Sequence, residues 1–166
     1  MNPILRSAFV LTLLAAGPAH ARALNSVMAN TLMPYKDSAN GFELKRPGGW
    51  KVSRGDAAVA FYAEGDHPGE AMFVSRPTPT TKDLAALVKD AKATKGTEVS
   101  TVTLNGLPAV RVDLNAASGG KQYHARTYTL VSKKRLFNVT LRCLQADYAT
   151  ETVVFDNVAK SLKFAK

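Results

Sequence analysis

The middle of the chain predicts an antiparallel sheet, and this prediction restricts the fold more than any other feature. Asn105-Gly106 lies between two extended runs, 99–104 and 108–114. This dipeptide is the strongest short signal for a two-residue hairpin, because both of its residues accept a positive φ. Two further turn-and-strand pairs follow it: 118–120 leading into 123–131, and 133–135 leading into 137–143. We therefore expect a four-stranded meander.

Shorter extended runs precede this meander. Alternating or apolar stretches between turn residues predict strands over 42–45, 50–52, 57–62 and 71–75. Arg54-Gly55-Asp56 and Asp66-His67-Pro68-Gly69 are interpreted as turns between them. Aromatic residues on short alternating strands usually face the core, so Phe42, Trp50 and Phe61 are predicted to be buried.

Two helices are predicted from residue spacing. In the first, Thr80 or Thr81 is the expected N-cap, Asp83 lies in the first turn, and Gly96 ends the helix. Its apolar stripe consists of Leu84, Leu87, Val88 and Ala91. The second helix spans roughly 147–163, with a stripe of Val154, Phe155, Val158 and Leu162. Strand runs flanked by helices predict an α+β fold with a mainly antiparallel sheet.

The first residues have the form of a secretory signal peptide. Arg6 is followed by an uncharged apolar run, 8–16, and then by Ala19-His20-Ala21, which suits a signal peptidase. The run is about half of the ~20 residues that span a bilayer, which disfavours a membrane anchor. Cleavage is expected after Ala21, or alternatively after Ala23. The predicted organisation is a signal peptide at 1–21, an N-terminal leader at 22–38 and one domain at 39–166.

Composition limits how the domain is stabilised and what it attracts. Cys143 is the only cysteine, which excludes an intrachain disulfide and leaves no thiol near the signal for a lipid anchor. Alternation places Cys143 on one strand face with Phe137, Val139 and Leu141, so we expect a buried, unreactive thiol. The net charge of +9 favours anionic surfaces, but the charges are spread along the chain. That spread disfavours nucleic acid and is equally typical of simple solubility.

Three segments resemble PsbP-like domains. The first runs from Tyr35 through Asn40-Gly41-Phe42 to Pro47-Gly48-Gly49-Trp50, the second is Leu104–Ala109, and the third runs from Phe155 to Phe164. The resemblance implies an α/β/α sandwich, a fold shared with the Ran-binding Mog protein and with bacterial DcrB-like envelope proteins. It also implies a non-enzymatic domain that binds other proteins. No cofactor or ligand site of the family maps onto this sequence.

Motifs for catalysis are scarce. After the predicted cleavage only His67 and His124 remain, so no histidine-based metal site has enough ligands, and no metal or cofactor is expected. The sequence contains no G-x-S-x-G elbow, P-loop or dinucleotide glycine pattern. A small hydrolase using His124 with Asp113 and Lys121 is an open but disfavoured alternative.

The meander predicts one candidate binding site. If Val110 and Val112 face the same side as Val139 and Leu141, the alternate residues share the other face. Arg111, Arg126 and Arg142 would then form a row across three strands, with Asp113 and His124 one pair along. Facing strand residues lie ~5 Å apart, so these arginines would need an anion or an acidic partner. Alternatively, each arginine pairs locally with Asp113, Glu43 or another acid, or covers a helix with its stem.

These observations support three hypotheses for a periplasmic or secreted protein. The first is a non-enzymatic accessory domain that binds a protein partner or complex in the cell envelope. The second is a domain that binds an anionic small molecule or polymer through the arginine row. The third is the hydrolase. No segment after the signal is long and apolar enough to cross a membrane.

Overall fold

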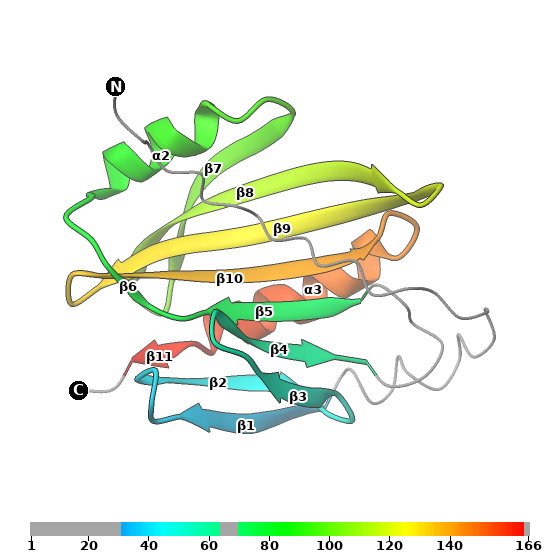
Figure 1. Cartoon of the computed structure of the whole chain (residues 1–166), viewed down its shortest axis with the longest axis horizontal. Helices are drawn as coiled ribbons and strands as arrows, with labels where there is room; N and C mark the ends of the chain where they lie inside the picture. Colours follow the sequence, from blue (N-terminus) through cyan, green and yellow to red (C-terminus); the bar gives the residue numbers. More distant parts are fainter. Residues whose placement is uncertain (1–30, 64–69, 165–166) are drawn as a thin grey trace.

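The computed structural model describes residues 31–63 and 70–164, and β-sheets dominate it (Figure 1). The large sheet contains, in spatial order, β3 (Lys51–Arg54), β4 (Ala58–Tyr62), β5 (Ala71–Ser75), β10 (Arg135–Leu144), β9 (Lys121–Ser132), β8 (Leu107–Ser118) and β7 (Thr97–Leu104), with β6 (Thr78–Pro79) also paired to β10. The small sheet contains β1 (Leu32–Asp37), β2 (Phe42–Pro47) and β11 (Lys163–Phe164). Every strand pair is antiparallel, which confirms the predicted fold class.

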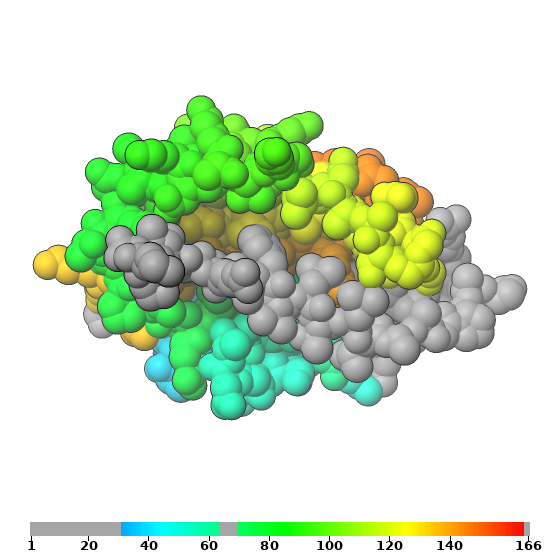
Figure 2. Space-filling model, turned by 45° about the horizontal axis from the view of Figure 1, so that its top comes forward, coloured from blue at the N-terminus to red at the C-terminus, as the bar shows by residue number. Residues whose placement is uncertain are grey.

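The two helices lie on opposite faces of the large sheet. Helix α2 (Leu84–Lys92) packs on β7, β8 and β9, whereas α3 (Tyr148–Lys160) packs on β9, β10 and β2 (Figure 1). Figure 2 shows α2 standing above the sheet beside the β8–β9 turn. The main core joins the small sheet, α3 and the α3 side of the large sheet, and includes the predicted Phe42, Trp50 and Phe61. Burial of such large apolar side chains is the main stabilising contribution to the fold.

The predicted meander is present, and its turns set the register. Asn105 and Gly106 both have positive φ, 48° and 81°, as a two-residue hairpin turn requires. The other turns also contain only two residues, Gly119-Gly120 and Lys133-Lys134, all with positive φ. For the last of these turns we predicted three residues, ending at Arg135. This prediction was wrong, because Arg135 already pairs with Ser132. This one-residue difference exchanges the two faces of β10 relative to β9.

The N-terminus of helix α2 is capped by an aspartate and not by either of the predicted threonines. The Asp83 carboxylate accepts a hydrogen bond from the Ala86 backbone N–H at 2.8 Å, so Asp83 is the N-cap. The expected caps Thr80 and Thr81 lie outside the helix, where the Thr80 hydroxyl accepts from the Lys82 N–H instead. The helix ends at Lys92, so Gly96, with a φ of 77°, belongs to the turn that enters β7.

The C-terminal helix is shorter than its sequence period indicates. Helix α3 ends at Lys160, and the chain then pairs with β2 through Lys163 and Phe164. Leu162 is nevertheless buried, as the stripe predicted, because it packs in the main core. The apolar spacing identified Phe155, Val158 and Leu162 as buried, whereas Val154 is only half-buried. It did not identify the point at which the backbone changes from helix to strand.

The end of the expected leader is a strand. Residues 32–37 form β1, which pairs along its whole length with β2. Their core-facing side chains, Leu32 and Tyr35, pack against the main core, so they belong to the folded unit. The signal peptide, the rest of the leader and the predicted turn at 66–69 lie outside the described residues. No helix within 31–63 and 70–164 is long and apolar enough to cross a membrane.

We predict that Asp83→Ala lowers the free energy of unfolding by about 1 kcal/mol, since it removes the cap of α2. Thr81→Ala, which alters one of the originally expected caps, should change it by less than about 0.5 kcal/mol. Urea denaturation monitored by circular dichroism measures both values. Equal losses in the two variants would contradict the assignment of Asp83 as the N-cap.

Candidate functional site

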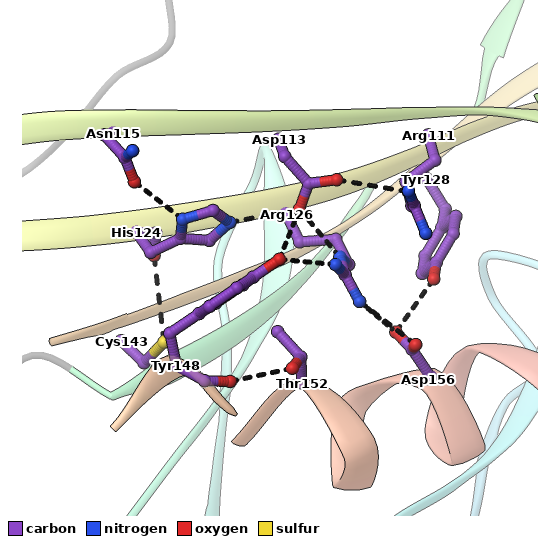
Figure 3. Close-up of polar contacts among 10 residues, drawn as sticks. All are labelled: Arg111, Asp113, Asn115, His124, Arg126, Tyr128, Cys143, Tyr148, Thr152 and Asp156. Carbon is purple, nitrogen blue, oxygen red and sulfur yellow. Dashed lines mark hydrogen bonds and ion pairs between the residues drawn. The ribbon is translucent and has the colours of Figure 1, made fainter. Parts of the chain in front are cut away.

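A cluster of buried polar side chains lies between the large sheet and α3 (Figure 3). Its members come from three elements and are called here the Asp113 cluster: Arg111 and Asp113 on β8, His124 and Arg126 on β9, and Tyr148 and Asp156 on α3. Asp113, His124 and Arg126 are each less than 10% exposed. Burying charged groups is costly unless they are paired, so these contacts are structurally decisive.

Arg126 is the centre of the cluster. Its Nε donates to Asp113 Oδ1 at 2.8 Å, and its Nη1 donates to both carboxylate oxygens of Asp156 at 3.0 Å. Its Nη2 donates to the Tyr148 hydroxyl at 2.5 Å. One guanidinium thus joins β8 to α3, and the hydrogen bonds together offset the cost of burying its charge.

The Asp113 carboxylate is contacted by four polar side chains of the cluster. Its Oδ1 accepts from Arg126, from the Tyr148 hydroxyl at 3.2 Å, and lies 3.0 Å from His124 Nε2. Its Oδ2 forms an ion pair with Arg111 Nε at 3.1 Å. The other ring nitrogen of His124 lies 2.7 Å from Asn115 Oδ1. Both carboxylate oxygens are therefore occupied by groups of the protein itself.

The contacts determine the ionisation of Asp113. Burial alone would raise the pKa of this carboxyl, but the hydrogen bonds from Arg126 and His124 and the nearby positive charges outweigh it and hold the pKa below its usual value. The carboxylates of Asp113 and Asp156 in turn raise the pKa of Arg126, against the opposing effect of burial. Asp113 and Arg126 therefore stay charged at neutral pH.

The predicted arginine row is not formed. In the observed register Asp113 faces Arg126, and Leu141, not Arg142, lies opposite Arg126 on β10. Arg142 therefore lies on the other face of the sheet, where its guanidinium stands 5.5 Å from the centre of the Tyr123 ring. Arg111, Arg126, Asp113 and His124 do come together, but as opposite charges that pair with one another. Local pairing, the alternative interpretation, describes Arg111 and Arg126.

The proposed hydrolase residues are not assembled either. His124 and Asp113 are in contact, but Lys121 alternates onto the opposite face of β9. Cys143 is fully buried beside His124, with its Sγ 3.9 Å from the His124 carbonyl oxygen. Burial, followed by nearby carboxylates, raises the pKa of this thiol to about 12, so it is protonated and unreactive at neutral pH, as predicted.

Sequence reasoning missed the α3 half of the cluster. Tyr148 and Asp156 were assigned only to a helix, so the hydrogen bond that the Tyr128 hydroxyl donates to Asp156 at 2.8 Å was not predicted. Asp156 lies four residues after Thr152 and three before Ala159, which are both buried, so it borders the core-facing side of α3. This spacing was the available signal, because a carboxylate on that side needs hydrogen-bond donors from the facing sheet.

The chemistry open to the Asp113 cluster is restricted by its own contacts. Its carboxylates, guanidiniums and ring nitrogens are engaged with one another, and no activated nucleophile lies among the residues drawn in Figure 3. Within 31–63 and 70–164, no group of three or more His, Cys, Asp or Glu side chains could hold a metal ion. The geometry is that of a structural connection between the sheet and α3.

Comparison with known proteins identifies the fold. No family model and no curated protein sequence matches the chain. Solved structures similar to this chain include a Bacteroides thetaiotaomicron protein (TM-score 0.60, 16% identity), the cyanobacterial PsbP (CyanoP) of Synechocystis (0.63, 18%), and Mycobacterium tuberculosis LpqN, described as involved in cell envelope biogenesis (0.53, 16%).

The similarity extends over most of this chain and over nearly the whole of two of these structures. The similarity covers 89% of this chain and 98% of CyanoP, and 90% of this chain and 100% of LpqN. For the Bacteroides protein it covers 75% of this chain but only 45% of that protein. The chain therefore has the PsbP-like fold that its sequence motifs indicated.

We predict that Arg126→Met lowers the free energy of unfolding by about 3–5 kcal/mol, because it leaves the buried Asp113 carboxylate and the half-buried Asp156 carboxylate without their main partner. Arg142→Met, on the opposite face, should cost about 1 kcal/mol or less. Guanidinium chloride denaturation gives both values. A loss for Arg126→Met no larger than that for Arg142→Met would refute the structural role of the cluster.

Acid should remove the contribution of Asp113. Its pKa is depressed in the folded protein, so this contribution is fully present above the ordinary value of 3.8 and is lost as the pH falls through the folded value. Asp113→Asn cannot gain this charge-dependent stability. The difference in unfolding free energy between wild type and Asp113→Asn should therefore be larger at pH 7 than at pH 3, and denaturation series at both values test it. A constant difference would show that the Asp113 charge does not contribute.

Proposed function

We propose that the chain is an exported, non-enzymatic binding domain that acts on a protein partner in the cell envelope. The observation that carries the proposal is the internal pairing of the Asp113 cluster. The one dense group of buried titratable residues within 31–63 and 70–164 is engaged in holding α3 and presents no reactive group. Such a domain is suited to acting through its surface instead.

The PsbP-like fold supports the same proposal by analogy. LpqN, which shares the fold, is described as involved in cell envelope biogenesis. The predicted signal peptide at 1–21 would deliver this chain to the periplasm or the medium. Fold similarity at this level raises the expectation of an accessory role without identifying a partner.

The edge of the large sheet offers a surface for a protein partner. Strand β7 pairs only with β8 within the described residues, and its eight residues include no proline and no lysine. Sheet edges are normally protected by such residues, because an unpaired strand can accept another strand. Alternate side chains of β7, including Thr101 and Thr103, are exposed. We infer that an extended segment of the partner adds to this edge.

Site-specific crosslinking tests this proposal. A photoreactive amino acid at Thr101 should yield one discrete adduct with an envelope protein in the native host. The same probe at Lys134, an exposed residue of the β9–β10 turn, is the matched control and should yield none. Adducts of equal amount at both positions, or none at either, would contradict partner binding at β7.

The same strains test export. Mass spectrometry of the recovered protein should give a chain that begins at Arg22 or, for the alternative cleavage site, at Leu24. Deleting residues 2–21 should abolish both the processing and the Thr101 adduct. An adduct that persists in the deletion strain would show that the partner is not in the envelope.

A further inference from the structure

A second charged region lies at one end of the molecule, away from the Asp113 cluster. A solvent-open hollow of about 410 Å³ is lined by the β1–β2 turn, the β3–β4 turn and the residue after β5. Its charged lining residues are Lys36, Asp37, Arg54 and Arg76, so positive side chains outnumber negative ones three to one. A hollow of this size accommodates a small molecule.

The strand register brings the two arginines toward one point. Arg54 pairs with Val59, which pairs with Val74, so these residues point to the same face of the sheet. Arg76 follows Val74 by two residues and therefore shares that face. Two strand spacings separate Arg54 from Val74 by about 10 Å across β4, and Arg76 lies two residues farther along, so the arginine backbones are about 12 Å apart. Their long side chains can reach one group held between the guanidiniums.

Arg54 is held in place by an aromatic side chain. Its Nε donates to the Tyr35 hydroxyl at 3.1 Å, and its guanidinium lies 5.7 Å from the centre of the Tyr35 ring. Neither terminal nitrogen of Arg54 donates a hydrogen bond within the described residues. A guanidinium fixed through Nε keeps its two outer nitrogens available for a bidentate contact with an oxyanion.

The other charged residues of the hollow differ in whether they are free to bind a ligand. Both carboxylate oxygens of Asp37 accept hydrogen bonds from Asn40, each at 3.0 Å, and Asp37 is only 5% exposed. Lys36 forms an ion pair with Glu43 at 3.0 Å. The Arg76 side chain has no hydrogen bond or ion pair within 31–63 and 70–164 and is exposed. Arg54 and Arg76 are thus the two cations left to bind an anion.

We propose that this hollow binds a phosphate group, held between Arg54 and Arg76. A phosphate carries close to two negative charges at neutral pH and several acceptor oxygens, which matches two guanidiniums better than a singly charged carboxylate does. The group can belong to a soluble phosphate monoester, with close to two charges on three free oxygens, or to a lipid headgroup. The phosphodiester of a headgroup carries one charge on two free oxygens, and these can still accept hydrogen bonds from both guanidiniums. This site is independent of partner binding at β7, so either proposal can fail alone.

Binding of inorganic phosphate to the exported protein tests the site. Calorimetric or NMR titration at constant ionic strength should give saturable binding to the wild type. Arg54→Gln/Arg76→Gln should weaken it by about tenfold or more. Lys89→Gln/Lys92→Gln removes the same charge from α2, far from β1 in Figure 1, and should leave the affinity within about twofold.

Tyr35→Phe separates a built site from general attraction. It preserves every charge but removes the hydroxyl that fixes Arg54, and should weaken phosphate binding by about two- to threefold. Circular dichroism and thermal melts confirm that each variant is folded. No saturable binding to the wild type, or equal losses in the two double variants, would overturn the proposal.

The source of the phosphate is resolved by two further probes. Glycerol 3-phosphate should compete with inorganic phosphate if the ligand is a soluble ester. Sedimentation with phosphatidylglycerol vesicles, but not with phosphatidylcholine vesicles, that is lost in Arg54→Gln/Arg76→Gln would identify a headgroup. Sedimentation that survives in this variant and falls in Lys89→Gln/Lys92→Gln would count against the hollow as the lipid site.

Discussion

The pairing of Asp113 with Arg126 is the interaction on which the rest of the structure depends. These two residues face each other on β8 and β9, and Arg126 continues to Asp156 on α3. A buried charge pair stabilises a fold only where its remaining donors and acceptors are also satisfied. Here Tyr148 and His124 add hydrogen bonds and Arg111 adds an ion pair, so the position of α3 on the sheet is determined by polar contacts as well as by the apolar stripe.

Two-residue turns explain why these residues meet. With Gly119-Gly120 at the first turn and Lys133-Lys134 at the second, Asp113 lies opposite Arg126 and Arg126 lies opposite Leu141. One extra residue in the second turn would bring Arg142 into contact with Arg126 on the same face. Side chains alternate with a period of two, so a single residue in a turn separates repulsion from attraction.

Because the register depends on single turn residues, the sequence predicts the strands of this fold better than it predicts which side chains meet. The strands of the meander, the buried face of β10 and the PsbP-like fold were predicted, because alternation, hairpin signals and motifs are local properties. The faces of β10 and β9 relative to each other were not, since Lys133-Lys134 adopts positive φ with two non-glycine residues. Tyr148 and Asp156 entered the site from α3, a contact between distant segments that no local pattern encodes.

The proposed anion site lies at one end of the molecule, and not in the centre of the large sheet where the arginine row was predicted. Arginines inside the domain are paired because unpaired charge there is expensive, and Arg111 and Arg126 follow that rule. Arg54 and Arg76 lie at strand ends that face a solvent-open hollow. Water solvates a guanidinium there, so leaving it without an acidic partner costs little free energy. Tyr35 adds the orientation that water cannot provide. A basic domain of this fold therefore separates its charges into an inner set that holds α3 and an outer set free to bind.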